Sequence, residues 1–229
     1  MTRVLVPVEI LEGKTVSAGL IDLLGPVDVT VLGYHVLPEQ TPPDQARQQY
    51  EERATAALDD LSEAFRGAGG AADRRLVFTH DREQTVERVA DEVGARAFAV
   101  SGTAGGVDSL LVSLSGDVAV DRILEFVTEL IGDRSIGVTL LLAGETDDDR
   151  LGAAATRLGD AGIDFETVTT SGKPFESLMD AVPDHDAIVM GEAAPSLRSL
   201  VFGDEADRVA AASVGPVLVV RNRTSDESA

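Results

Sequence analysis

The feature that most constrains the fold is a pair of short apolar runs near the C-terminal end of the chain. Residues 187–190 read AIVM and stop at Gly191, and residues 217–220 read VLVV. Runs this short, unalternating and rich in β-branched residues are typical of strands that are buried on both faces, as in a parallel sheet. A loop and a helical pattern that opens at Gly203 and Asp204 separate the two runs. The segment therefore predicts a right-handed βαβ unit.

The loop of this unit lies between the carboxyl end of a strand and the start of a helix, which is where α/β folds bind phosphates. Residues 186–221 resemble the C-terminal signature of the universal stress protein family. In that signature a strand ends in Gly-x-x-Gly, nine residues follow, and Gly with Ser or Thr opens a helix that leads to a strand beginning Pro-Val-Leu-Val-Val. The match is good at 189–191, at Gly203 and at 216–221.

The chain departs from this signature at the positions that matter for chemistry. Ala194 stands in place of the second glycine, eight residues separate it from Gly203, and Asp204 replaces the hydroxyl residue. In family members that bind ATP, the glycines and the hydroxyl lie at the triphosphate. The resemblance therefore implies the family fold with a degenerate nucleotide site, because a carboxylate repels phosphate.

A similar unit is predicted earlier in the chain. Residues 95–101 read as a strand, Gly102-Thr103-Ala104-Gly105 follows it, and Gly116-Asp117 opens a predicted helix that ends at residue 131. Ten residues separate Gly105 from Gly116, one more than in the family pattern, and Asp117 again replaces the hydroxyl residue. We interpret residues 95–131 and 186–214 as an internal repeat of strand, glycine loop and helix.

The N-terminal strand, residues 3–9, resembles the first strand of the family, which ends in Pro-Val-Asp at the adenosine. Residues 27–36 form the next predicted strand and resemble the ending of the family's second strand. The resemblance thus implies two sets of nucleotide-binding residues. The first-half set is Pro7, Val8, Glu9, Val36, Gly102, Thr103, Gly105, Gly116 and Asp117, and the second-half set is Gly191, Gly203 and Asp204.

The apolar patterns predict helices over 13–24, 44–66, 82–93, 147–158 and 174–182, and further strands over 74–79, 136–144 and 163–169. The strand over 136–144 could close a first domain or open a second, and the element count favours the first choice. The expected α/β fold has two doubly wound, mostly parallel sheets of the universal stress protein or adenine nucleotide alpha hydrolase-like type, packed across a pseudo-twofold axis. The domains are residues 1–144 and an abbreviated 145–223, with a frayed tail at 224–229.

Composition narrows the classes of function. The 229 residues include 40 acids and 19 bases, which gives a net charge of −21, and the acids are spread along the chain. This pattern favours adaptation to high salt, as in a halophile, over an acidic partner-binding surface, and it disfavours nucleic acid as a partner. The absence of cysteine excludes disulfides and thiolate catalysis. No apolar run approaches the roughly 20 residues of a membrane span, so we expect a cytoplasmic protein without a membrane partner.

Other candidate residues favour structural roles. His35, His80 and His185 lack an accompanying serine or acid motif, and Asp81 suits a helix N-cap. The acids at 147–149 could bind Mg²⁺, but an acidic helix start explains them more simply. The sequence has neither a phosphate-binding P-loop motif nor a Gly-x-Ser-x-Gly motif.

Three functions follow from the resemblance. We favour a stress-response module that acts by binding or scaffolding without turnover. The alternative is an ATP-binding sensor or slow ATP hydrolase that uses ATP with Mg²⁺ in the first domain, with Glu9 and His35 as the only available bases. The third is a dimerisation scaffold with both sites inactive. A homodimer or an intramolecular pseudo-dimer is expected, together with an unknown protein partner.

Overall fold

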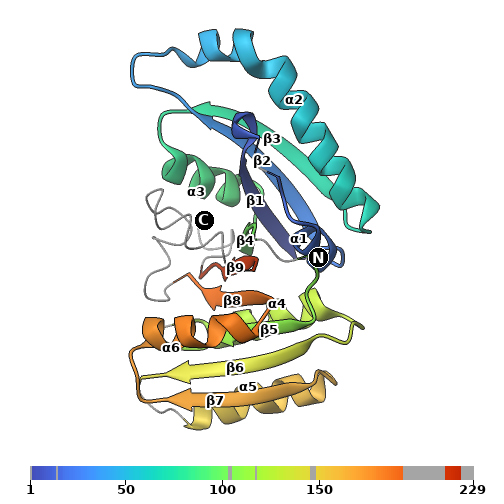
Figure 1. The fold of residues 1–229 in the computed structure, drawn as a ribbon, viewed down its shortest axis with the longest axis vertical. Coiled ribbons are helices and arrows are strands. Elements are labelled where there is room, and N and C mark those ends of the chain that lie inside the picture. The colour runs from blue at the N-terminus through green and yellow to red at the C-terminus, as the bar shows by residue number, and fades with distance from the viewer. Residues whose placement is uncertain are drawn as a thin grey trace.

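The computed structural model describes residues 2–13, 15–102, 105–116, 118–144, 148–192 and 215–222. In these residues nine strands form one sheet in the order β3-β2-β1-β4-β9-β8-β5-β6-β7 (Figure 1). Every neighbouring pair is parallel except β4 with β9. The predicted class, a mostly parallel α/β sheet, is confirmed. The strands are β1 (Arg3–Glu9), β2 (Asp28–Val36), β3 (Ala72–Thr79), β4 (Ala97–Val100), β5 (Ser109–Ser113), β6 (Gly137–Ala143), β7 (Phe165–Thr170), β8 (Ala187–Gly191) and β9 (Val217–Val220).

The antiparallel pair joins two runs of parallel strands into a single sheet. Ala97 of β4 lies opposite Val220 of β9, and Val100 lies opposite Val217. The N-terminal run is β3-β2-β1-β4 and the C-terminal run is β9-β8-β5-β6-β7. The two expected sheets are therefore one continuous sheet, because the backbone edges of β4 and β9 are hydrogen-bonded to each other.

The strand order also corrects the expected division of the chain. β6 lies between β5 and β7 in the C-terminal run, with Val138 paired to Leu110 on one side and to Phe165 on the other. It does not close a first unit that ends at residue 144. The C-terminal run has five strands and the N-terminal run has four, so the N-terminal run is the shorter one, contrary to expectation. Residues 224–229 lie outside the described part of the chain.

The predicted loop between Gly102 and Gly116 contains β5. Its residues Leu110, Leu111 and Val112 are fully buried, because β5 pairs with β8 on one side and with β6 on the other. The proposed repeat of strand, glycine loop and helix at 95–131 is therefore wrong, since a second strand interrupts it. The helical part of the second copy, at 203–214, lies outside the described residues.

The helices agree closely with the apolar patterns except at two starts, since the helix expected to open at Gly116-Asp117 begins at Val120. The stretch expected as a helix over 13–24 forms α1 only from residue 18, where Ser17 is the N-cap and its hydroxyl accepts from the Leu20 N–H at 3.3 Å. The helices are α1 (Ala18–Leu23), α2 (Pro43–Gly67), α3 (Arg82–Glu92), α4 (Val120–Ile131), α5 (Asp148–Asp160) and α6 (Pro174–Ala181), with 3₁₀ turns η1 (Ile10–Glu12) and η2 (Val182–Asp184).

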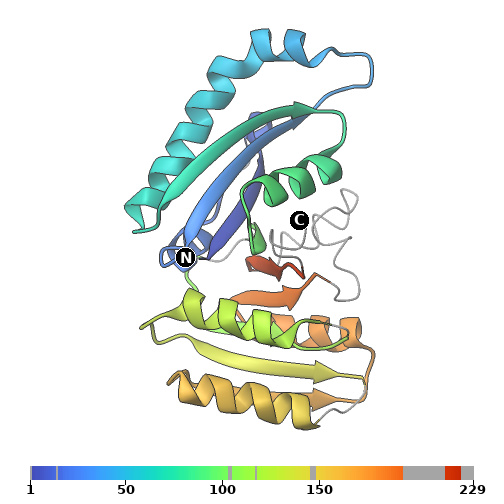
Figure 2. The same ribbon diagram turned by 180° about the vertical axis from the view of Figure 1, so that it is seen from behind.

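Helices cover both faces of the sheet, as in a doubly wound fold. Successive residues of a strand point to opposite faces. In β2, Gly33 lies under Leu58 of α2, whereas the Tyr34 ring contacts the guanidinium of Arg82 at the start of α3. In the C-terminal run α6 lies on one face and α4 with α5 on the other, as the two opposite views show (Figures 1 and 2). The apolar residues of both runs form one continuous buried core.

Candidate functional site

The strand order reverses at two places, and such reversals are where open α/β sheets bind ligands. The first lies at the carboxyl ends of β1 and β4, and the second at the carboxyl ends of β5 and β8. We call them the N-terminal and C-terminal switch points. The antiparallel β4–β9 pair makes the carboxyl ends of β4 and β9 face opposite edges of the sheet. The two switch points are therefore separate sites.

At the N-terminal switch point β1 and β4 separate early. Their pairing includes only Val4 with Ala97 and Leu5 with Phe98, whereas β1 stays paired with β2 as far as Glu9. A proline in a central strand is tolerated where the ladder has ended on one side, which is the case at Pro7. Glu9 is 8% exposed and has an interaction partner within the protein. The divergence brings Pro7, Val8 and Glu9 to this edge.

Two serines that the sequence did not point to connect the elements of this switch point. The Ser101 hydroxyl, just after β4, accepts a hydrogen bond from the Ser17 N–H at 2.8 Å. The Ser17 hydroxyl in turn caps α1. A serine immediately before an apolar helical stripe is a recognised N-cap signal, and it could have identified Ser17. The two hydroxyls are thus already bonded to the protein at the edge where a phosphate would approach.

The C-terminal switch point is closed by a side chain. A Cβ atom placed on Gly191, at the end of β8, would lie 2.8 Å from Val118 Cγ1 and 3.3 Å from Ile123 Cδ1. Gly191 is therefore required for the close approach of the segment that leads into α4. This packing occupies the place beside the glycine where the family resemblance implied a phosphate, so the described residues here do not fit a nucleotide.

Backbone groups around the C-terminal switch point are also satisfied internally. Arg150 Nη1 donates to the Gly116 carbonyl at 2.9 Å and to the Leu114 carbonyl at 3.2 Å. The buried Ser115 hydroxyl accepts from the Ala143 N–H at 2.8 Å. Gly116 adopts a positive φ of 85°, a conformation that glycine takes without strain. These contacts join the ends of β5 and β6 to α5.

The structure divides the expected first-half set of nucleotide residues between the two runs. Glu9 and Val36 are the last residues of β1 and β2, and Gly102 follows β4, whereas Gly116 follows β5 in the C-terminal run. Gly191, of the second-half set, is the last residue of β8. A side chain on Gly105 would meet no neighbour within 4 Å. Thr103, Asp117, Gly203 and Asp204 lie outside the described residues.

The histidines contact protein groups. The His35 ring makes edge contacts with the rings of Tyr50 and Phe78, at centroid distances of 5.9 and 6.4 Å. His80 Nδ1 lies 3.2 Å from the Leu37 carbonyl oxygen. The expected N-cap role of Asp81 is confirmed, since its carboxylate accepts from the Gln84 N–H at 2.9 Å.

A polar cluster, separate from the residues expected to bind nucleotide, lies at the amino ends of β5, β6 and β8. The Asp186 carboxylate accepts from the Ser109 hydroxyl at 2.8 Å and from the Asp108 and Ser109 N–H groups at 3.0 Å. These hydrogen bonds, the Ser109 hydroxyl first, lower the pKa of Asp186 against the opposing effect of burial. His185 Nε2 lies 2.7 Å from the Thr139 hydroxyl. The cluster aligns the starts of these strands, and it lies at the opposite ends of β5 and β8 from the C-terminal switch point.

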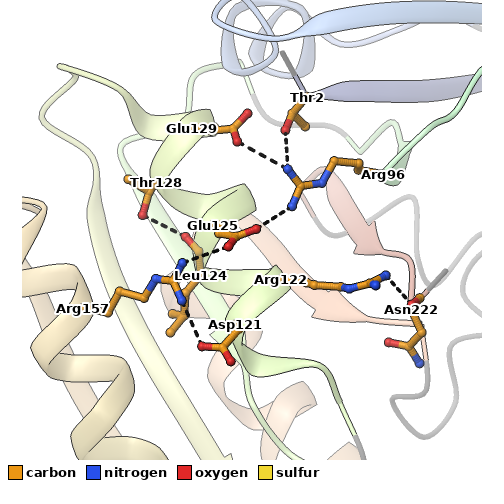
Figure 3. Close-up of polar contacts among 10 residues, drawn as sticks. All are labelled: Thr2, Arg96, Asp121, Arg122, Leu124, Glu125, Thr128, Glu129, Arg157 and Asn222. Atoms are coloured by element: carbon orange, nitrogen blue, oxygen red, sulfur yellow. Dashed lines mark hydrogen bonds and ion pairs between the residues drawn. The ribbon is translucent and has the colours of Figure 1, made fainter. Parts of the chain in front are cut away.

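An ion-pair network connects β4, α4 and α5 (Figure 3). Arg96 donates to Glu125 at 2.8 Å and to Glu129 at 3.4 Å, and Arg157 donates to Asp121 at 2.9 Å and to Glu125 at 3.2 Å. Arg96 is the largest cause of the lowered pKa of Glu125, burial acts against it, and Arg157 lowers it further. Because Arg96 precedes β4 while α4 belongs to the C-terminal run, the network crosses between the two runs.

Arg134 and Arg221 make two more links between the runs. Arg134, after α4, donates to the carbonyls of Asp22 and Leu23 of α1 at 3.0 and 2.8 Å. Burial lowers the pKa of this guanidinium, and Asp22 opposes that effect. Arg221, after β9, is buried against α3 and β4. Within the described ranges, no group of three or more acids or histidines could hold a metal ion, and no helix is long and apolar enough to cross a membrane.

Comparison with known proteins agrees with this architecture. Residues 127–221 match the model of the universal stress protein family. The whole fold is similar to that of a universal stress protein from Archaeoglobus fulgidus DSM 4304, with a TM-score of 0.66, 17% identity and coverage of 98% of this chain and 97% of that one. A functionally unknown protein from Pseudomonas aeruginosa PAO1 has a TM-score of 0.55 at 14% identity, with 98% and 93% coverage. No curated protein sequence matches the chain.

Proposed function

We propose that the protein is a stress-response module that acts by binding or scaffolding and does not turn over a nucleotide. The family match over 127–221 supports the general role. The observation that supports the absence of nucleotide turnover is the packing of Val118 and Ile123 on Gly191. A nucleotide phosphate at that position would have to displace two apolar side chains from a core contact. A cytoplasmic location and an unidentified protein partner are part of the proposal.

The proposal includes a tandem organisation within one chain. The N-terminal unit is β1 to β4 and the C-terminal unit is β5 to β9, with the joint at β4 and β9. Three observations favour a fixed arrangement of these units: the antiparallel β4–β9 ladder, the Arg96 network and the buried Arg221. The protein would then present one rigid surface to a partner, as an intramolecular pseudo-dimer suited to scaffolding.

Isothermal titration with ATP and Mg²⁺ tests the non-catalytic reading. It should be done at about 1 M KCl, where the Debye length is about 3 Å and repulsion between the acidic protein and the nucleotide is screened. We expect no binding by the wild type at the C-terminal switch point and no phosphate release. Mass spectrometry of small molecules released from the purified protein should likewise find no nucleotide. Steady phosphate release would overturn the proposal, and tight ATP binding that persists in Glu9→Gln would contradict the closure of the C-terminal switch point.

Two kinds of variant show whether side-chain packing or charge repulsion prevents nucleotide binding. Val118→Ala removes the side chain that packs on Gly191, and Asp117→Ser and Asp204→Ser remove the carboxylates from the family's hydroxyl positions. If packing is the block, Val118→Ala gains ATP affinity while the two serine variants do not. If charge repulsion is the block, the serine variants gain affinity instead.

The second candidate function is ATP binding at the N-terminal switch point. It is favoured by the early separation of β1 from β4 and by the carboxylate of Glu9 at that edge. Glu9→Gln tests it directly, because a residue that contacts adenosine would change ATP affinity when its charge is removed. Unchanged titration curves for Glu9→Gln and wild type would leave scaffolding as the only supported function.

A further inference from the structure

In the described part of the chain the sheet ends at β7, which pairs with β6 on one side and with no strand on the other. All six residues of β7 are exposed or partly exposed, including Phe165 at 38% and Val168 at 37%. An edge strand of this kind is a template for pairing with another strand. Five of its six residues, all but Glu166, are aromatic or β-branched types that favour strands. The edge is therefore suited to pairing.

The opposite edge of the sheet is protected, which makes the contrast informative. β3 carries the exposed charged residues Asp73, Arg74 and Arg75, and Arg74 forms an ion pair with Asp59 of α2. Charges on an edge strand disfavour pairing with other strands. In β7 the only charge is Glu166, and its carboxylate accepts from the Thr139 hydroxyl of the neighbouring strand β6 at 3.0 Å. That bond directs the charge back over the sheet.

The helix beside this edge has a flank of small residues. Arg157 marks the side of α5 that faces α4, through its bonds to Asp121 and Glu125. Gly159 marks the other side, since a Cβ there would lie 3.7 Å from the Phe165 ring of β7. Gly152 shares this side at helical spacing, and its added Cβ would meet no neighbour within 4 Å. A glycine inside a helix costs roughly 0.5–1 kcal/mol relative to alanine, so two of them on one flank call for a packing reason.

We propose that a second copy of this chain pairs with the first through β7, antiparallel and about a twofold axis at Val168. Such an axis perpendicular to the sheet places Val168 opposite its own copy, Thr167 opposite Thr169 and Glu166 opposite Thr170. The arrangement avoids opposing two Glu166 side chains, which would repel each other. It also continues both helix layers, and the small flanks let the two α5 helices approach closely. This interface goes beyond the proposed function, which concerns the units within one chain.

Charge explains why the occupant is another copy. Two molecules of net charge −21 can approach closely only where each surface carries little charge, and β7 is such a strand. Its two ends differ in charge, because Asp164 precedes it, whereas the exposed Lys173, which forms an ion pair with Glu176 at 2.8 Å, follows it. Antiparallel pairing brings the Lys173 end of each copy to the Asp164 end of the other. A single strand surface thus complements itself.

A charge-swap experiment on the full chain tests the register. Sedimentation equilibrium at about 1 M KCl, where screening is strong, should show a wild-type dimer. Val168→Glu and Val168→Lys should each raise the dimer dissociation constant at least tenfold, because like charges then face each other across the axis. An equimolar mixture of the two variants should restore dimers. A monomeric wild type, or a mixture that stays monomeric while both variants remain folded, would overturn the proposal.

Further variants test the contributions of the α5 flank and of β7 to dimerisation without loss of folding. Gly152→Gln improves helix propensity, so the melting temperature should hold or rise while the dimer dissociation constant increases at least tenfold. Ala153→Gln on the exposed face of α5 is the matched control and should leave the dimer unchanged. The chain has no cysteine, so any disulfide formed by a variant must involve the single cysteine that was introduced. Val168→Cys should form a disulfide-linked dimer with mild oxidant, whereas Arg75→Cys on β3 should not, and the reverse result would place the interface at the other edge.

Discussion

The contact between Arg221 and Asp91 offers the sharpest test of how the two runs of strands are held together. Arg221 follows β9, is 5% exposed, and donates through Nη2 to Asp91 of α3 at 2.6 Å and through Nη1 to the Ala95 carbonyl at 3.2 Å. Its guanidinium also lies 5.3 Å from the centroid of the Phe98 ring. The Asp91 side chain, in contrast, is 56% exposed. This asymmetry decides the prediction.

Removal of the acid should cost more than removal of the base. Asp91→Ala leaves a buried guanidinium without its counter-charge, and such a loss costs about 3–5 kcal/mol. Arg221→Met leaves a carboxylate that water can solvate, and it fills the buried volume with an apolar chain. The loss is then the hydrogen bonds to Asp91 and to the Ala95 carbonyl and a cation–π contact, together about 2–3 kcal/mol, because the apolar replacement offsets part of these losses. The double variant should resemble Arg221→Met alone.

Urea unfolding at fixed KCl measures these differences as shifts in midpoint at constant slope. The matched control is Glu92→Ala on the same helix, which breaks an exposed pair with Arg88 and should cost only about 0.3–0.5 kcal/mol. A double-mutant cycle then isolates the Arg221–Asp91 coupling. If Asp91→Ala costs no more than Glu92→Ala, or if the two single effects simply add, the Arg221–Asp91 pair does not hold the runs together.

Three further predictions concern stability. The buried Thr30 hydroxyl has no hydrogen-bond partner in the described structure, so Thr30→Val should stabilise the protein by about 1 kcal/mol. Thr139→Val loses the hydrogen bonds to His185 and Glu166 and should destabilise it by about 1–2 kcal/mol. The urea midpoint should therefore rise in the first variant and fall in the second. The pKa of Asp186 is lowered on folding, so its stabilisation is present above its ordinary pKa of about 3.9 and is lost as the pH falls through the lower folded value; Asp186→Ala should flatten the acid side of the stability profile. Thermal midpoints should rise as KCl increases from about 0.01 to about 1 M, because the charge of −21 is then screened, and a flat series would contradict adaptation to high salt.

Local chemistry in the sequence predicted most of the elements. The uninterrupted β-branched runs at 187–190 and 217–220 are strands because only burial on both faces suits them, and both are fully buried. The long amphipathic pattern became α2, where Ala54, Leu58 and Phe65 are buried at helical spacing. Asp81 was identifiable as an N-cap because its role depends on residues only three positions away. Signals that lie within one turn or one strand are readable from the chain alone.

Strand order and the content of the sites required the tertiary structure. β5 was missed because its short apolar run becomes a strand only through its neighbours β6 and β8, which lie far from it in sequence. The same pairing separates Gly116 from Glu9, although the glycine spacing suggested one loop. Gly191 matches the position of a phosphate-binding glycine in the family signature, but Val118 and Ile123 pack where the ligand would approach. A glycine in the sequence indicates only that another group approaches the backbone closely. Long-range packing decides whether that group is a ligand or a side chain.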